Sequence, residues 1–148
     1  MVAGLLHDLG KLILGTYLKD ELLRITDKLD NGTPYYQAEE ESGTPHTLLG
    51  YILAKKWGLP DIHLSAILYH HNPSADPYRS LSTSLVALAD KIVKGLGFGL
   101  THGSRPIDND HIRKQIQLDG DAIENVVARA EKTLPLLIVG WQQGLLDG

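Results

Sequence analysis

Apolar residues recur at three- and four-residue spacing through most of this chain, the pattern of helices that bury one face. No stretch shows the strict alternation of a strand. Prolines and turn signals such as Asp30-Asn31-Gly32 separate the apolar stretches, and Thr33 and Thr44, each followed by proline, are predicted N-caps. Helices are predicted over residues 3–14, 17–29, from 34, 45–57, 60–71, 81–96, 108–118 and from 122. The chain is therefore expected to be all-α, a single-domain bundle of roughly six to eight helices around one core.

The stretch AGLLHDLGKLIL, residues 3–14, sets His7 and Asp8 side by side among leucines. Its apolar residues recur at helical spacing, so we expect one continuous core-facing helix whose inward positions are Leu5, Leu6, Leu9, Leu12 and Ile13. Polar groups buried in such a helix need a partner or a metal. Lys11 follows one turn after Asp8, which indicates a site built into a core helix.

Other segments offer the same types of metal ligand among apolar neighbours. They are His46 in TPHTLLG, the doublet His70-His71 in AILYHHNP, and Asp90 in VALADKIV. Imidazole and carboxylate groups suit Zn, Mn, Fe or Ni, and with no cysteine any metal must use nitrogen and oxygen ligands. Asp90 is equally well explained by an ion pair with Lys94 one turn later. One histidine of the doublet alternatively caps the end of its helix.

The acidic run Glu39-Glu40-Glu41 has two interpretations. A solvated helix face is favoured, and the alternative turns one glutamate toward the metal site. Three further histidines lie outside these motifs and are expected at the surface or at the rim of the site; they are His63, His102 and His111.

Composition narrows the classes of function. The net charge of −4 argues against a nucleic-acid-binding surface. No signal peptide is apparent at the start, and the apolar run 134–141 is too short to span a bilayer, so we expect no membrane role and a cytoplasmic location. The part from Leu136 to Trp141 is densely apolar, which predicts a homodimer through this segment. Packing of the same segment on its own core is the alternative.

The order of the motifs, HDxGK, then HxxxG, then HH, then AD, resembles the HD superfamily of metal-dependent phosphohydrolases. The finer pattern, with GTPHTLLGYILAKKWGLPDIHLSAILYHHNP followed by LVALADKIV, looks like an HDOD domain over about residues 3–99. The resemblance implies a divalent metal (Fe, Mn, Ni or Zn) in a site that is either filled or vestigial. It implies catalytic roles for Asp8 and Lys11, and as metal ligands it implies His7, Asp8, His46, His70, His71 and Asp90.

Two functions follow from this resemblance. HDOD domains are typically signalling or scaffold units, which implies protein partners that the sequence does not name. The alternative is a phosphohydrolase or phosphodiesterase acting on nucleotides or cyclic dinucleotides, as in the HD-GYP enzymes. The chain departs from those enzymes after the doublet, where Asn72-Pro73 stands and no Gly-Tyr-Pro element follows. HD enzymes also use a histidine upstream of the HD pair, and no histidine precedes His7, so residues 1–148 are expected to lack the upstream helices of longer relatives. The balance favours a non-catalytic regulatory domain with at most one bound metal.

Overall fold

The computed structural model describes residues 2–98 and 109–146, and within these ranges the chain is helical with no strand, which confirms the all-α prediction. In chain order the elements are α1 (Val2–Leu6), α2 (Leu9–Tyr17), α3 (Lys19–Asp30), α4 (Tyr35–Ser42), α5 (His46–Lys56), α6 (Asp61–Tyr69), a 3-10 turn η1 (Pro73–Ala75), α7 (Leu81–Gly95), α8 (Asn109–Ile116) and α9 (Gly120–Leu146).

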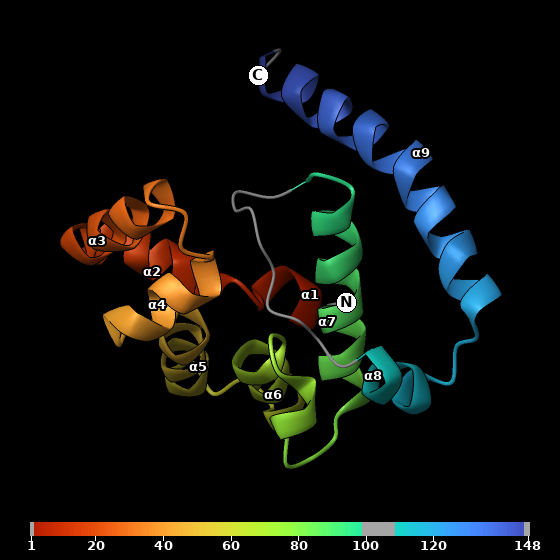
Figure 1. Ribbon diagram of the computed structural model, residues 1–148, viewed down its shortest axis with the longest axis horizontal. Coiled ribbons are helices and arrows are strands. Elements are labelled where there is room, and N and C mark those ends of the chain that lie inside the picture. The colour runs from red at the N-terminus through yellow and green to blue at the C-terminus, as the bar shows by residue number, and fades with distance from the viewer. Residues whose placement is uncertain (1, 99–108, 147–148) are drawn as a thin grey trace.

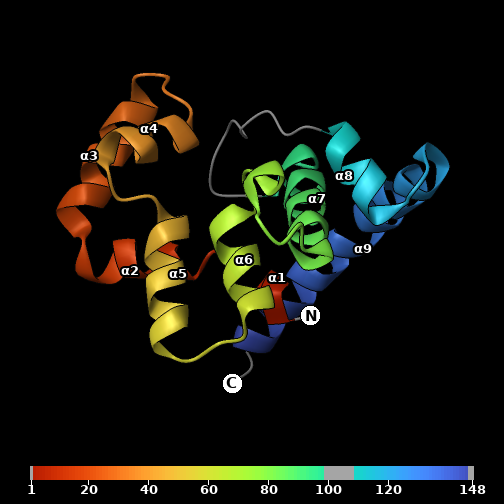
Figure 2. The same ribbon diagram turned by 90° about the horizontal axis from the view of Figure 1, so that it is seen from below.

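The helices form two groups that meet where α5 packs against α6. In the first group α2 packs on α5 and on α3, and α3 packs on α4. In the second group α6 packs on α7 and α1 packs on both, while α7 carries α8. Figure 2 shows α5, α6 and α7 side by side in this order. Each group has its own apolar cluster, one around Leu14 and Ile25 and one around Ala66 and Val86, and a third cluster around Ile67 joins them.

The closest helix contact is the crossing of α2 over α5. A Cβ atom added to Gly10 would overlap the backbone carbonyl oxygen of His46, and one added to Gly50 would lie 3.1 Å from the backbone nitrogen of Gly10. Only glycine allows the two backbones to approach this closely. Gly10 and Gly50 therefore let α2 and α5 come close, which brings His46 near Asp8.

The continuous helix predicted over residues 3–14 is wrong. The helix breaks at His7-Asp8, so that α1 and α2 are separate and Asp8 is the residue before α2. The contacts of these two polar side chains outweigh local helical periodicity, because α1 turns onto α6 and α7 while α2 turns onto α5. The break also rotates the apolar face, and two of the leucines predicted to face the core are exposed, Leu5 at 83% and Leu12 at 68%.

Smaller differences concern helix starts and faces. The N-cap positions of α4 and α5 are Pro34 and Pro45 rather than the threonines before them, since both prolines have extended backbone. His46 is consequently the first residue of α5. The N-terminal part of α7 buries Ser82, Thr83 and Ser84, whereas Ala89 is exposed.

The last helix, α9, stands apart from the rest. It runs along the edge of the molecule in Figure 1, and none of the extensively packed helix pairs includes it. Pro135 lies inside the helix without ending it. Among the described residues, no helix combines the length and the apolar character needed to cross a membrane.

Candidate metal centre

The predicted ligands come from both helix groups and meet between them. His7 and Asp8 lie at the break between α1 and α2, and His46 begins α5. His70 and His71 directly follow α6, and Asp90 lies on α7. His46 and His70 are completely buried, while the other side chains are partly exposed. The turn after α6 is what allows two adjacent histidines to face the same region.

Three acceptor atoms face one another at the centre of this cluster. Asp8 Oδ1 lies 3.1 Å from His46 Nε2 and 3.7 Å from His70 Nε2. The two Nε2 atoms are 3.5 Å apart. His71 completes the group, and one ligand atom from each of Asp8, His46, His70 and His71 lies within 4.8 Å of the others.

The hydrogen-bond partners of the two Nδ1 atoms, in His46 and His70, determine which ring nitrogen atoms carry protons. The Nδ1–H of His70 donates to the carbonyl oxygen of Ile67 at 2.9 Å, and Nδ1 of His46 lies 2.5 Å from Glu39 Oε2. A carbonyl and a carboxylate only accept hydrogen bonds, so in the neutral rings both Nε2 atoms present lone pairs. Asp8 Oδ1 is buried and has no hydrogen-bond partner among the described residues. Three acceptor atoms face one another here, and one of them has no hydrogen-bond partner among the described residues. Such a group of nitrogen and oxygen ligands fits a transition-metal cation.

The ionisation of these groups follows from their neighbours. Burial lowers the pKa of His46, but the carboxylates of Asp8 and Glu39 outweigh it and leave that pKa above its ordinary value. Burial, together with the charge of His46, lowers the pKa of His71 to about 3. Burial works against ionisation of Asp8, yet the neighbouring His46 ring and the Lys11 ammonium hold its pKa below the ordinary range. Metal binding at these side chains therefore depends on pH, because an ion competes with protons for the same lone pairs.

A second polar group adjoins the cluster. Nε2 of His7 lies 3.5 Å from Asp8 Oδ2 and 3.9 Å from Asp90 Oδ1. Lys11 is 2.7 Å from Asp8 Oδ2, and Lys94 is 2.7 Å from Asp90 Oδ2. Both interpretations of Asp90 thus describe part of its surroundings, because it pairs with Lys94 while facing two histidines. His7 and Asp90 lie beside the four-residue cluster and outside the set whose ligand atoms converge on one point in the described chain.

The favoured interpretation of the acidic run is wrong for one of its members. Glu40 and Glu41 are exposed as expected, but Glu39 is only 2% exposed and its carboxylate holds the ring of His46. The sequence contained a signal for this arrangement: Glu39 follows Tyr35 and Ala38 at helical spacing, and all three are buried on one face of α4. A glutamate in register with apolar residues differs from its solvated neighbours.

The remaining residues singled out from the sequence are Lys11 and the three histidines outside the motifs. Lys11 lies at the edge of the cluster, where its ammonium is part-buried and bonded to Asp8. His63 is half-buried. His102 and the side chain of His111 lie outside the described residues.

The chain is similar to known HDOD proteins. The family profile of the HDOD domain matches residues 1–73, which hold His7, Asp8, His46 and the doublet. A crystal structure of an HDOD domain protein with unknown function from Geobacter sulfurreducens superposes with a TM-score of 0.74 at 29% identity, over 90% of this chain and 49% of that one. Residues 1–73 therefore carry an HDOD domain.

The chain also resembles an uncharacterized protein of Treponema pallidum (strain Nichols). The two are 31% identical over 99 residues, which make up 64% of this chain and 19% of that protein. The chain thus spans about half the length of the solved structure that it matches and about a fifth of this relative.

Proposed function

We propose that this HDOD domain is a regulatory module that holds one divalent transition metal between Asp8, His46, His70 and His71. The observation that carries the proposal is the position of Asp8 Oδ1. This oxygen is buried, has no hydrogen-bond partner in the described part of the chain, and faces the Nε2 atoms of two histidines. An arrangement of acceptors around a buried carboxylate is costly unless a cation lies among them.

The ligands come from different elements, which makes the site suited to regulation. Asp8 precedes α2, His46 begins α5, and the doublet follows α6. An ion bound there supplies positive charge and Lewis acidity. Binding to the folded chain alone stabilises it, by about 2.7 kcal/mol when the free ion is at 100 times its dissociation constant. The presence of the ion thus changes the stability of the junction between the two helix groups.

One feature favours regulation over two-metal hydrolysis. The outward oxygens of Asp8 and Asp90 each carry a lysine ammonium at 2.7 Å, from Lys11 and Lys94. A second metal bound through these oxygens would have to displace or tolerate two positive charges. We therefore expect one ion per chain, whereas two-metal hydrolysis uses a pair of ions to stabilise both the attacking and the leaving oxygen.

The second candidate is a metal-dependent phosphohydrolase. The observation in its favour is Lys11, which is partly exposed beside Asp8 and has a charge suited to a phosphate oxygen. In that function Asp8 would orient the metal, and Lys11 would hold the phosphate of a nucleotide or cyclic dinucleotide.

Metal content and turnover distinguish the two functions. Purified protein is loaded separately with Zn, Mn, Fe(II) and Ni, its bound metal is counted, and it is assayed with cyclic dinucleotides and a generic phosphodiester. We expect one metal per chain, lost in His46→Ala, and no turnover that depends on Asp8. Turnover abolished by both Asp8→Asn and Lys11→Met would instead establish the phosphohydrolase. A chain that binds none of these metals would reject both functions.

The wider role is also part of the proposal. The net charge of −4 supports protein partners in signalling rather than nucleic acid. A cytoplasmic location suits a module of this kind.

A further inference from the structure

We infer that Glu39 is a positioning residue of the metal centre, which fixes the ring of His46 in the orientation and tautomer that present Nε2 to the ion. The inference rests on the proposed function, because it assigns a role toward the metal proposed there. Glu39 is not itself one of the converging ligands, since its carboxylate lies behind the His46 ring, at Nδ1.

The carboxylate holds His46 at two points. Oε2 lies 2.5 Å from the ring Nδ1, and Oε1 accepts the backbone N–H of His46 at 3.4 Å. That N–H belongs to the first residue of α5 and has no partner within its own helix. One buried side chain therefore both completes the start of α5 and orients the first side chain of that helix.

The surroundings of Glu39 keep its carboxylate in place. Burial and the neighbouring carboxylate of Glu39 raise the pKa of Tyr35. The hydroxyl of Ser42 donates to the Glu39 carbonyl at 2.7 Å and also accepts the N–H of Thr44. These bonds tie the end of α4 to the start of α5, so the seven-residue spacing from Glu39 to His46 is fixed by local structure.

His70 provides a comparison within the same site. Its Nδ1–H donates to a backbone carbonyl, whereas that of His46 donates to a side-chain carboxylate. Both partners leave Nε2 free, but a carboxylate also makes the imidazole a stronger donor to the metal. The charge of Glu39 thus distinguishes the two buried histidines, and its removal tests that charge without removing a ligand.

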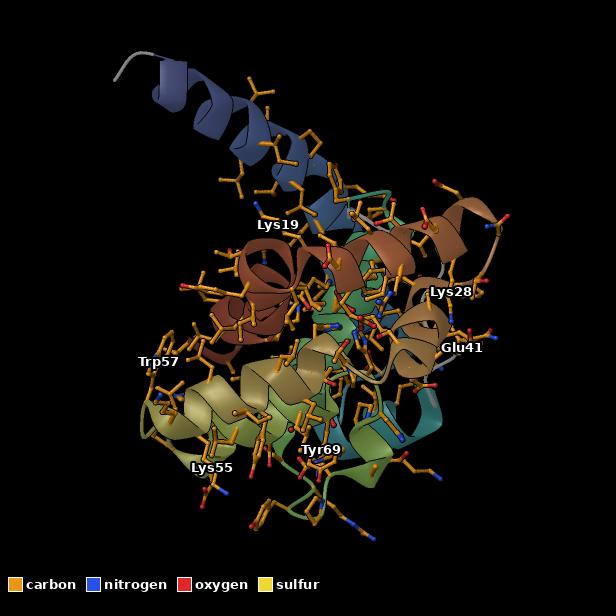
Figure 3. All side chains as sticks on the ribbon, turned by 90° about the vertical axis from the view of Figure 1, so that its left-hand side faces the viewer. Lys19, Lys28, Glu41, Lys55, Trp57 and Tyr69 are labelled. Carbon is orange, nitrogen blue, oxygen red and sulfur yellow. The ribbon has the colours of Figure 1, made fainter. Side chains whose placement is uncertain are left out.

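The test is the affinity of the whole chain for Zn²⁺, measured by competition with a chromophoric chelator. We expect Glu39→Gln to weaken zinc binding by about 10–100-fold, because removal of such an outer partner typically has an effect of this size. The matched control is Glu41→Gln, which removes the same charge from the same helix. Glu41 is bonded to Lys28 and Gln37, and Figure 3 shows it beside Lys28, so we expect zinc affinity to stay within about twofold.

A second measurement does not depend on any variant. Long-range ¹⁵N spectra of the zinc-loaded wild-type protein should show His46 with its proton on Nδ1 and its metal on Nε2. Unchanged zinc affinity in Glu39→Gln, or zinc on Nδ1 of His46, would overturn the role of Glu39 and leave the proposed function standing. Absence of zinc binding in the wild type, with no binding of Mn, Fe(II) or Ni, would overturn the proposed function and this inference together.

Discussion

Gly10 of α2 lies directly against the backbone carbonyl of His46 at the start of α5, with no room for a side chain between them. We expect Gly10→Ala to lower the free energy of unfolding by about 1–3 kcal/mol or more, because the added methyl group forces the two backbones apart. The separation should also weaken metal binding, since His46 moves with α5. Urea unfolding measures the first effect and chelator competition the second.

The control lies on the same helix. Gly15 of α2 has no atom within 4 Å of the position that a Cβ would take. Gly15→Ala should raise the free energy of unfolding by about 0.5–1 kcal/mol, the usual gain in a helix. A similar gain in both variants would show that helix propensity, rather than the crossing, decides the result.

A buried carboxylate outside the metal centre gives the second prediction. Asp76 accepts hydrogen bonds from the hydroxyls of Ser65 and Thr83 and from the backbone N–H groups of Tyr78 and Ser80. Asp76→Asn replaces one accepting oxygen with an amide that donates, so a buried donor loses its partner. We expect a loss on the order of 3 kcal/mol in urea unfolding. Zinc affinity should stay unchanged, and a large loss of affinity would place Asp76 in the metal centre after all.

The acid stability of the metal-free protein gives the third prediction. The pKa of His71 is about 3 in the folded chain, against an ordinary value of 6.5. Its contribution to stability is fully present above pH 6.5 and is lost as the pH falls from 6.5 toward 3. His46 has the opposite sign, because its pKa is raised: its contribution is present below pH 6.5 and is lost as the pH rises through the folded value.

Thermal unfolding between pH 6.5 and 4 tests this balance. The unfolding midpoint of the wild type should fall across this window, and that of His71→Asn should fall less steeply. The lowered carboxyl pKa values of Asp8 and Asp90 act mainly below this range. Parallel curves for the two proteins would contradict the burial of a neutral His71.

The fourth prediction concerns self-association. The apolar segment of α9 is exposed, from Leu136 at 73% to Ile138 at 39%. The expectation of a homodimer through this segment therefore stays a prediction, and a second copy of the chain is the partner that we expect. Light scattering at high concentration should give a dimer, and Leu136→Glu should return it to a monomer. Leu23→Glu, at another exposed leucine, is the control; a monomeric wild type would reject the dimer.

Much of the fold was predictable because its signals are local. Prolines mark the starts of α4, α5 and α6, and glycines mark the ends of α4 and α5, to within one or two residues. The ligand types at His46 and the doublet were evident from their apolar neighbours. The break at His7-Asp8 was not predictable from periodicity, since no proline or glycine marks it. It depends on contacts with residues far along the chain, which local patterns do not contain.

Local sequence patterns were equally insufficient to predict the role of Glu39 in the site. Three consecutive glutamates have the same chemistry, and only their register on α4 separates the buried one from its neighbours. Likewise, the buried hydroxyl groups at the start of α7 follow from the position of Asp76, which accepts the bond from Thr83. Polar residues become part of a core when a partner in space satisfies them, and that partner is fixed by the fold.

The break at His7-Asp8 gives the two adjacent residues different attachments. Asp8 continues into α2 and the first helix group, whereas His7 ends the segment that packs on α6 and α7. An ion held by Asp8 and His46 on one side and by His70 and His71 on the other would link the two helix groups across the contact between α5 and α6. Thermodynamic coupling is reciprocal: if the ion raises or lowers the affinity of a partner for this contact, the partner changes the affinity for the ion by the same factor. A partner that binds the outer faces of α5 and α6 would therefore strengthen or weaken metal binding without contacting any of the ligands.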